Sequence, residues 1–431
     1  MPDPGQPTPF RTVRDQRLSM FQAAAGTASA APGPMPALEQ AAGRAAALAA
    51  AEQPIPVQAP ADLPQHAWTC ARLGLALLQA ELGPDGPARA ALEEALAGSR
   101  CDPRWAGTLV SYLQYFGPGG RRRRIPYVTP DKAGPGVIAL PAQARVALIS
   151  DWGTGRRTAR AVMADLARHR PDVLIHLGDI YYAGTPDECE RNFAGPVQEV
   201  FGDARPPVFT LSGNHDMYSG GEGYYGLIAR LNDGVWRQPA SFFCLRGPHT
   251  QFVAMDTGLH AYDPFDKHPL TFIDPAEADW IEARIREFPG RTVLLSHHPL
   301  FSALAQIGPG GPDGWNPRLL GAFRRFAAAG RVAVWFWGHE HTMALYAPHA
   351  GLARGRCIGC GAIPMLVADG LYAPLPGLHD PAPLLPPRLR HDGRVQDHGY
   401  AVVQTEADGL ARAEYWGVGA KAGMLWAEDF D

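Results

Sequence analysis

Five short polar clusters, each directly after an apolar run, carry the side chains of this chain that could do chemistry. They are Ser150-Asp151-Trp152-Gly153, Gly178-Asp179-Ile180-Tyr181-Tyr182, Gly213-Asn214-His215-Asp216, Ser296-His297-His298-Pro299 and Gly338-His339-Glu340-His341. Between them they offer carboxylates, a phenol, an amide oxygen and imidazoles, which are the donor groups of metal sites. If the loops that hold these clusters meet at one point, the set forms a metal site.

The apolar run before each cluster is typical of a buried β-strand. These runs are residues 146–149, 173–177, 208–211, 293–295 and 332–337, and they are short and rich in β-branched residues. In α/β sheets, ligand-binding groups gather in the loops beyond the strand ends. The sequence therefore predicts two mixed sheets packed face to face, with helices outside, that bring the loops together.

Charge separates the candidate ligands into two groups. Asp151, Asp179 and a deprotonated Tyr182 would place three anions around one ion. A phenol has an ordinary pKa of about 10, so only a strongly charged hard cation would hold it as phenolate near neutral pH. Ferric iron is the natural candidate for that ion.

The remaining groups are neutral and suit a divalent ion. Asn214, His297 and His339 supply an amide oxygen and two imidazoles, and Asp179 could bridge to them. Such a site favours zinc, iron or manganese. His341 lies two residues from His339, so on an extended segment the pair shares a face and could serve two ions side by side. Two ions about 3.5–4 Å apart form a clamp for phosphoryl transfer.

The order of these motifs resembles that of the calcineurin-like metallophosphoesterase superfamily. Two positions make the motifs resemble those of the purple acid phosphatase branch: a tyrosine at Tyr182, and Gly153 where many relatives of the superfamily carry a histidine ligand. Residues 151–153 and 178–182 most resemble its tartrate-resistant type. The resemblance covers residues 145–346, with weaker continuity to residue 415, and it implies a four-layer fold of two packed mixed sheets flanked by helices.

The resemblance also implies a role for each matching residue. The first, ferric-type ion would be bound by Asp151, Asp179, Tyr182 and His341, and the second, divalent ion by Asp179, Asn214, His297 and His339. His215 would be a catalytic residue that binds no metal, and it would hold a phosphate oxygen or protonate the leaving group. His298 occupies a variable position beside a ligand and could contact substrate.

Three functions from different classes follow. The leading one is a phosphomonoesterase in which a metal-bound hydroxide attacks phosphorus with the help of His215. The alternative is a phosphodiesterase acting on a nucleotide, a lipid head group or nucleic acid, because the same centre can run both reactions. The third is a non-catalytic binding protein. The presence of every ligand position and of His215 argues against the third.

Composition limits the partners and the compartment. With 431 residues and a net charge of -4, the chain has no general attraction to nucleic acid or membranes, and we expect neither as a partner. Six cysteines are too few for a disulfide scaffold. The sequence around Cys357 and Cys360 indicates a strand that enters a turn, rather than a redox or zinc motif. The start lacks the layout of a secretory signal, so we expect a cytoplasmic protein, whereas tartrate-resistant enzymes are typically exported.

The chain divides into parts of different composition. Residues 1–36 are rich in proline, alanine and glycine and predict a mobile tail, and residues 37–116 predict a helical segment. Its helices are expected over 37–53, 63–82, 87–97 and 103–116. Residues 117–144 read as a linker, and 145–431 as the catalytic domain. The helical segment either packs on the catalytic domain as a cap or binds a protein partner.

Overall fold

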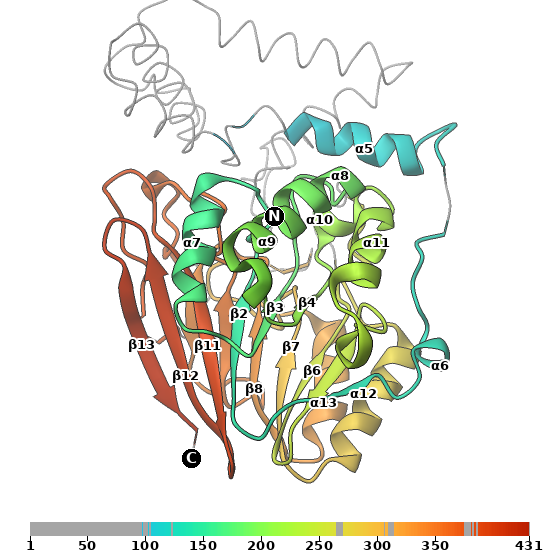
Figure 1. Ribbon diagram of the computed structural model, residues 1–431, viewed down its shortest axis with the longest axis vertical. Helices are drawn as coiled ribbons and strands as arrows, with labels where there is room; N and C mark the ends of the chain where they lie inside the picture. The colour runs from blue at the N-terminus through green and yellow to red at the C-terminus, as the bar shows by residue number, and fades with distance from the viewer. Residues whose placement is uncertain are drawn as a thin grey trace, which may run out of the picture.

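The computed structural model describes residues 97, 102, 105–121, 124–263, 270–305, 307–308, 314–374, 381, 383–384 and 387–430. Two β-sheets pack face to face, and helices cover their outer faces (Figure 1). The predicted tail and the predicted helices over 37–53 and 63–82 lie outside the described residues, as does all but the last residue of the helix over 87–97.

One sheet has six strands in the order β13-β12-β11-β2-β3-β4. Their bounds are β2 Ala144–Ile149, β3 Val173–His176, β4 Val208–Thr210, β11 His398–Glu406, β12 Gly409–Val418 and β13 Gly423–Asp429. Strands β2, β3 and β4 run parallel, and the three C-terminal strands add an antiparallel meander to β2. Strands β11 and β12 form a hairpin, with Glu406 opposite Gly409 at its end.

The other sheet has seven strands in the order β1-β5-β6-β7-β8-β10-β9. Their bounds are β1 Val137–Ala139, β5 Phe243–Arg246, β6 Thr250–Ala254, β7 Arg291–Leu295, β8 Val332–Trp337, β9 Met343–Tyr346 and β10 Gly355–Ile358. Strands β6, β7, β8 and β10 run parallel. Because β1 pairs with β5, part of the stretch predicted as a linker forms the edge of this sheet.

Helices form the two outer layers. The six-stranded sheet is covered mainly by α7 (Arg157–Ala167), α9 (Gly195–Phe201) and α11 (Glu222–Leu231), and the seven-stranded sheet by α12 (Pro275–Glu287) and α13 (Pro317–Ala327). Shorter helices are α6 (Pro130–Ala133), α8 (Pro186–Glu188) and α10 (Asn214–Met217), with a π-helical stretch at Cys189–Ala194 and 3-10 turns at Gly202–Ala204, Gly234–Trp236 and Val367–Asp369. No helix in the described part of the chain combines the length and hydrophobicity needed to cross a bilayer.

The helix α5 (Ala106–Phe116) is the described remainder of the predicted helical segment, and it lies beside α8 and α10 (Figure 1). It ends where the sequence predicts, at Gly117-Pro118, and the Gly117 N–H donates to the Leu113 carbonyl at 2.9 Å. Proline after the last turn cannot continue a helix. Helix α5 therefore lies at the same end of the fold as the loops that carry the motifs.

The motifs follow unbroken apolar runs because the side chains of each strand alternate between two faces that are both covered. Val146 and Leu148 of β2 belong to the core between the sheets, whereas Ala147 and Ile149 pack under the helices of the outer layer. Successive side chains of a strand point to opposite faces, and both faces are covered here. The predicted four-layer α/β fold is thereby confirmed.

Candidate dinuclear metal centre

The loops that follow β2, β3, β4, β7 and β8 meet, as the sequence predicts. Nδ1 of His297, after β7, lies 2.9 Å from the carbonyl oxygen of Leu177, after β3. The backbone N–H of His339, after β8, donates to Oδ2 of Asp151, after β2, at 2.9 Å. All of the clustered side chains are buried, namely Asp151, Asp179, Asn214, His215, His297, His298, His339 and His341.

One cluster consists of Asp151, Asp179 and His341, whose ligand atoms lie within 4.8 Å of one another. Nε2 of His341 is 3.1 Å from Oδ1 of Asp151. Two carboxylates and an imidazole form a donor set for a transition metal. These are three of the four residues that the family resemblance assigns to the first ion.

The second cluster consists of His297, His298 and His339, again within 4.8 Å of one another. Nε2 of His297 lies 3.2 Å from Oδ1 of Asn214 and 3.3 Å from Nδ1 of His339. It also lies 3.4 Å from Oδ2 of Asp179. Asp179 therefore stands between the two clusters, in the position that a bridging carboxylate requires.

The residues present fit two metal ions. His297 donates its Nδ1–H to a backbone carbonyl and turns Nε2 toward Asp179, which is how metal-binding histidines are commonly oriented. Nε2 of His298 is buried and has no hydrogen-bond partner among the described residues, while its Nδ1 lies 3.1 Å from Oγ1 of Thr257. A buried polar atom without a partner is costly unless it meets a ligand. Imidazole and carboxylate together suit zinc, iron or manganese.

The charges of the two clusters are strongly coupled. Burial lowers the pKa of His297, but the carboxylates of Asp179 and Asp151 outweigh it and raise that pKa to about 9. Burial raises the pKa of Asp179, and the imidazoles of His297 and His215 reverse this and hold it below its usual range. The carboxylates thus stay ionised only beside positive charge. Metal cations would supply that charge in place of protons.

Three of the candidate ligands have left-handed backbone conformations. The φ angles are +55° at Asp151, +75° at Asp179 and +66° at His339. Side-chain-bearing residues adopt this region rarely, and such residues concentrate at functional sites where the surrounding structure holds them. The strained positions therefore coincide with the donors that the sequence predicts.

Glycines next to the ligands allow the loops to approach. A Cβ atom at Gly213 would lie 2.0 Å from Oδ1 of Asp179, and one at Gly338 would lie 1.9 Å from Oγ of Ser150. Neither position can accept a larger residue without moving a ligand loop. The glycines of two motifs are thus explained by close approach rather than by turn geometry alone.

Asp216 joins two of the loops, a role that we did not predict. Its Oδ2 accepts the backbone N–H of Asp179 at 2.9 Å and that of Gly213 at 2.7 Å, and its Oδ1 accepts that of Ile180 at 3.2 Å. The loops after β3 and β4 are therefore held together by one buried carboxylate. The only sequence signal was its place at the end of the Gly-Asn-His-Asp motif.

His215 lies beside the clusters. Its Nδ1 is 2.7 Å from the carbonyl oxygen of Tyr182, and its Nε2 is 3.9 Å from Oδ2 of Asp179. Since a carbonyl only accepts, Nδ1 carries a proton and Nε2 faces the centre. The structure thus brings His215 next to the candidate ligands, where it could contact a phosphate oxygen.

The structure does not place Tyr182 among the candidate ligands. Its hydroxyl donates to the carboxylate of Asp102 and accepts from Nη2 of Arg156 at 2.7 Å. The preceding residue, Tyr181, enters the first cluster instead, with its hydroxyl 3.0 Å from Oδ1 of Asp151 and 2.9 Å from Nε2 of His341. The assignment from motif spacing is corrected by one residue, because contacts with Asp102 and Arg156 hold Tyr182 outside.

The Cys-x-x-Cys pair has no part in the centre. Cys357 and Cys360 are buried free thiols, and Cys357 lies in β10. Burial raises the pKa of both thiols well above the ordinary value, which makes them unreactive. Cys357 lies in β10 and Cys360 lies just after its end, as the sequence suggests.

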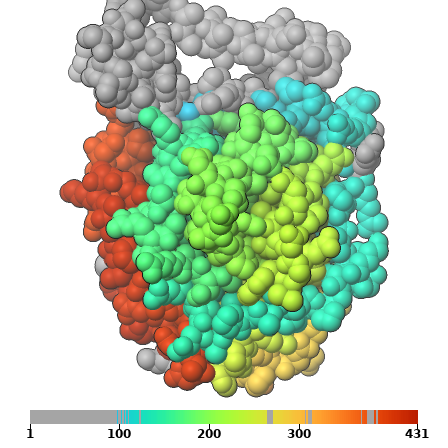
Figure 2. All heavy atoms as spheres, in the orientation of Figure 1, coloured from blue at the N-terminus to red at the C-terminus, as the bar shows by residue number. Residues whose placement is uncertain are grey.

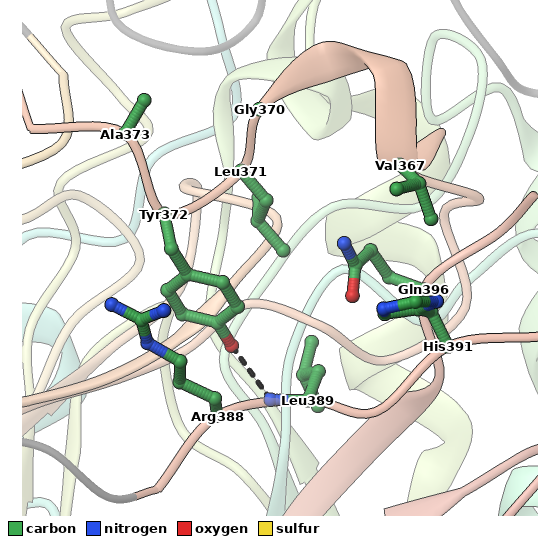
Figure 3. Close-up of a pocket in the computed structure, with 9 residues that line it drawn as sticks. All are labelled: Val367, Gly370, Leu371, Tyr372, Ala373, Arg388, Leu389, His391 and Gln396. Atoms are coloured by element: carbon green, nitrogen blue, oxygen red, sulfur yellow. Dashed lines mark hydrogen bonds between the residues drawn. The ribbon is translucent and has the colours of Figure 1, made fainter. Parts of the chain in front are cut away.

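A separate hollow of about 380 Å³ is lined by residues of the 367–396 region (Figure 3). The hydroxyl of Tyr372 accepts the backbone N–H of Leu389 at 2.8 Å, and the guanidinium of Arg388 lies 5.2 Å from the centroid of the Tyr372 ring. None of its lining residues belongs to the two clusters. The chemistry indicated by the sequence therefore lies at the metal centre.

Comparison with known proteins agrees with this geometry. Residues 144–343 match the calcineurin-like phosphoesterase family. The glycerophosphodiester phosphodiesterase GpdQ of Enterobacter lignolyticus is 25% identical over 181 residues, which are 41% of this chain and 59% of the relative. A probable cyclic nucleotide phosphodiesterase of Synechococcus is 26% identical over 144 residues, which are 33% of this chain and 48% of the relative. The chain thus spans less than two thirds of either relative.

A purple acid phosphatase from yellow lupin seeds is a distant structural neighbour. The likeness covers 67% of this chain and 54% of that protein, with 13% identity and a TM-score of 0.44.

Proposed function

Since residues 144–343 belong to the calcineurin-like metallophosphoesterase superfamily, we propose that this protein is a dinuclear metal-dependent hydrolase of phosphodiesters. The observation that carries the proposal is the position of Asp179 between two clusters of buried ligands. Two metal ions held about 3.5–4 Å apart would neutralise phosphate oxygens and activate water for attack on phosphorus. The first ion would be held by Asp151, Asp179 and His341, and the second by Asp179, Asn214, His297 and His339.

The roles of the neighbouring side chains follow from their positions. His215 carries its proton on Nδ1 and turns Nε2 to the centre, where it would hold a phosphate oxygen or protonate the leaving group. His298 lies among the second cluster and its buried Nε2 would meet the second ion or the substrate. Glycines 213 and 338 keep the loops close enough for these side chains to converge.

Phosphodiesters are favoured as the substrate class because both similar curated proteins carry phosphodiesterase names, one for glycerophosphodiesters and one for cyclic nucleotides. This preference replaces the phosphomonoesters that the resemblance to purple acid phosphatases suggests. Phosphomonoester hydrolysis remains a second candidate on a specific observation, the tyrosine hydroxyl in the first cluster. That hydroxyl also supports ferric iron in the first site, with iron, zinc or manganese in the second.

The deciding experiment compares two esters on one sample of known metal content. We expect the metal-loaded protein to hydrolyse bis-p-nitrophenyl phosphate faster than p-nitrophenyl phosphate, with two metal ions bound per chain. A higher rate on the monoester would select the second candidate. Hydrolysis of neither ester by protein that holds two ions would reject the phosphoesterase proposal.

A further inference from the structure

Residues that precede the family-matching part of the chain reach the metal centre. Asp102 and Trp105 precede α5 and Thr108 lies within it, and α5 lies beside α8 and α10 (Figures 1 and 2). All three are buried, and all three contact Tyr182. Tyr182 in turn contacts His215 through its backbone.

Tyr182 is held at its hydroxyl, its ring and its carbonyl by this segment. Its hydroxyl donates to the carboxylate of Asp102, which also lies 3.4 Å from Nη2 of Arg156. Its ring meets the ring of Trp105 edge-on, with centroids 4.6 Å apart. Oγ1 of Thr108 donates to its carbonyl oxygen at 3.3 Å. That same oxygen accepts Nδ1–H of His215 at 2.7 Å.

Trp105 also contacts the catalytic histidine directly. Its ring centroid lies 5.4 Å from that of His215 and 5.9 Å from that of Tyr181. Trp105 is fully buried, so its ring fills the space into which either of these side chains could otherwise turn. Packing of this kind restricts rotamers because protein interiors are close-packed.

We propose that Asp102, Trp105 and Thr108 position His215, so that the segment before the catalytic domain completes the phosphoesterase site. The inference rests on the proposed function, in which His215 acts on the phosphate ester. The segment fixes the position of the Tyr182 carbonyl, and this carbonyl accepts the Nδ1–H of His215. Nε2 of His215 is thereby fixed toward the metal centre. A misplacement of about 1 Å in a catalytic group can lower turnover by about 10²-fold.

A double-mutant cycle tests this chain of contacts. Trp105→Ala should lower kcat by about 10–100-fold while the bound metal ions are retained. In a His215→Asn background the same substitution should produce no further loss, because the side chain that it positions is gone. Thr108→Val, which removes only the hydrogen bond to the Tyr182 carbonyl, should behave in the same way with a smaller effect.

Several controls separate positioning from general damage. Trp105→Phe, which keeps an aromatic ring, should recover most of the activity, and Val110→Ala on the exposed face of α5 should leave kcat unchanged. Binding of inorganic phosphate, measured by calorimetry on the zinc-loaded protein, should weaken in Trp105→Ala and not in Val110→Ala.

Equal fold-losses from Trp105→Ala in the wild-type and His215→Asn backgrounds would overturn the inference. If Trp105→Ala does not fold, the cycle with Thr108→Val decides by the same criterion. A wild-type protein that hydrolyses neither ester would instead reject the proposed function, and the two failures are therefore distinct.

Discussion

The hydroxyl of Tyr181 lies 3.0 Å from Oδ1 of Asp151, inside the first metal cluster. If ferric iron occupies that cluster, this hydroxyl is the phenolate that would produce a visible charge-transfer band. Tyr181→Phe should remove the band from the oxidised, iron-loaded protein, and Tyr182→Phe should keep it. Absorption spectra recorded with iron content on the same samples make the comparison.

Persistence of the band in Tyr181→Phe together with its loss in Tyr182→Phe would restore the assignment from motif spacing. A colourless, fully active protein with two zinc or manganese ions would reject ferric iron. It would leave the phosphoesterase proposal intact, because the remaining ligands still form a two-metal clamp.

Substitution of His215 separates binding from chemistry. His215→Asn should retain both metal ions and lower turnover by about 10²–10⁴-fold, the usual range for loss of a positioned acid or base. Metal analysis and steady-state kinetics on the same preparation check both halves of the prediction. Loss of metal along with activity would mean that His215 is itself a ligand.

Asp179 should behave in the opposite way. Asp179→Asn removes the carboxylate that stands between the clusters, so we expect metal content to fall and activity to fall with it. Asp187→Asn is a matched control, because Asp187 is exposed and pairs with Arg191 on the surface. Two ions retained in Asp179→Asn would argue against a shared bridge.

Much of the centre could be predicted because its side chains follow buried strands in a fixed order. Asp151, Asp179, Asn214, His297, His339 and His341 come together as expected, since parallel strands deliver their following loops to one edge. Apolar runs also predicted the strands themselves, because both faces of each sheet are covered.

The choice between Tyr181 and Tyr182 could not be predicted in the same way. Two adjacent tyrosines in one loop cannot both face the cluster, and motif spacing selects the second. The contact that decides is with Asp102, 80 residues earlier in the chain, and no local pattern reports it. The pairing of β1 with β5 was missed for a similar reason, because a three-residue edge strand has no distinctive periodicity.

An ion pair between the buried Arg356 of β10 and the partly buried Glu428 of β13 joins the two sheets. Nε and Nη2 of Arg356 donate to the two carboxylate oxygens at 2.7 and 2.6 Å, and the Tyr415 hydroxyl donates to Oε1 at 2.6 Å. Glu428→Gln would leave the guanidinium buried without its counter-charge, so the free energy of unfolding should fall by about 3–5 kcal/mol. Urea denaturation of the metal-loaded protein measures this.

A surface pair between β12 and β13 provides the comparison. Arg412 and Asp429 are 2.8 Å apart, but Asp429 is 68% exposed. Asp429→Asn should therefore lower the free energy of unfolding far less than Glu428→Gln does, because solvent screens an exposed pair. Equal effects from the two substitutions would show that burial of the Arg356 pair does not strengthen it.

The pair of Arg356 and Glu428 should also make stability depend on pH in the acid range. Burial raises the pKa of Glu428, but the guanidinium of Arg356 outweighs it and holds that pKa below the ordinary value of about 4.3. The stabilisation is therefore complete above the unfolded-state pKa and is lost as pH falls through the folded-state pKa. The difference in unfolding free energy between wild type and Glu428→Gln should be constant near neutrality and shrink below about pH 4. A difference that stays constant through this range would show that ionisation of Glu428 contributes nothing to the join between the sheets.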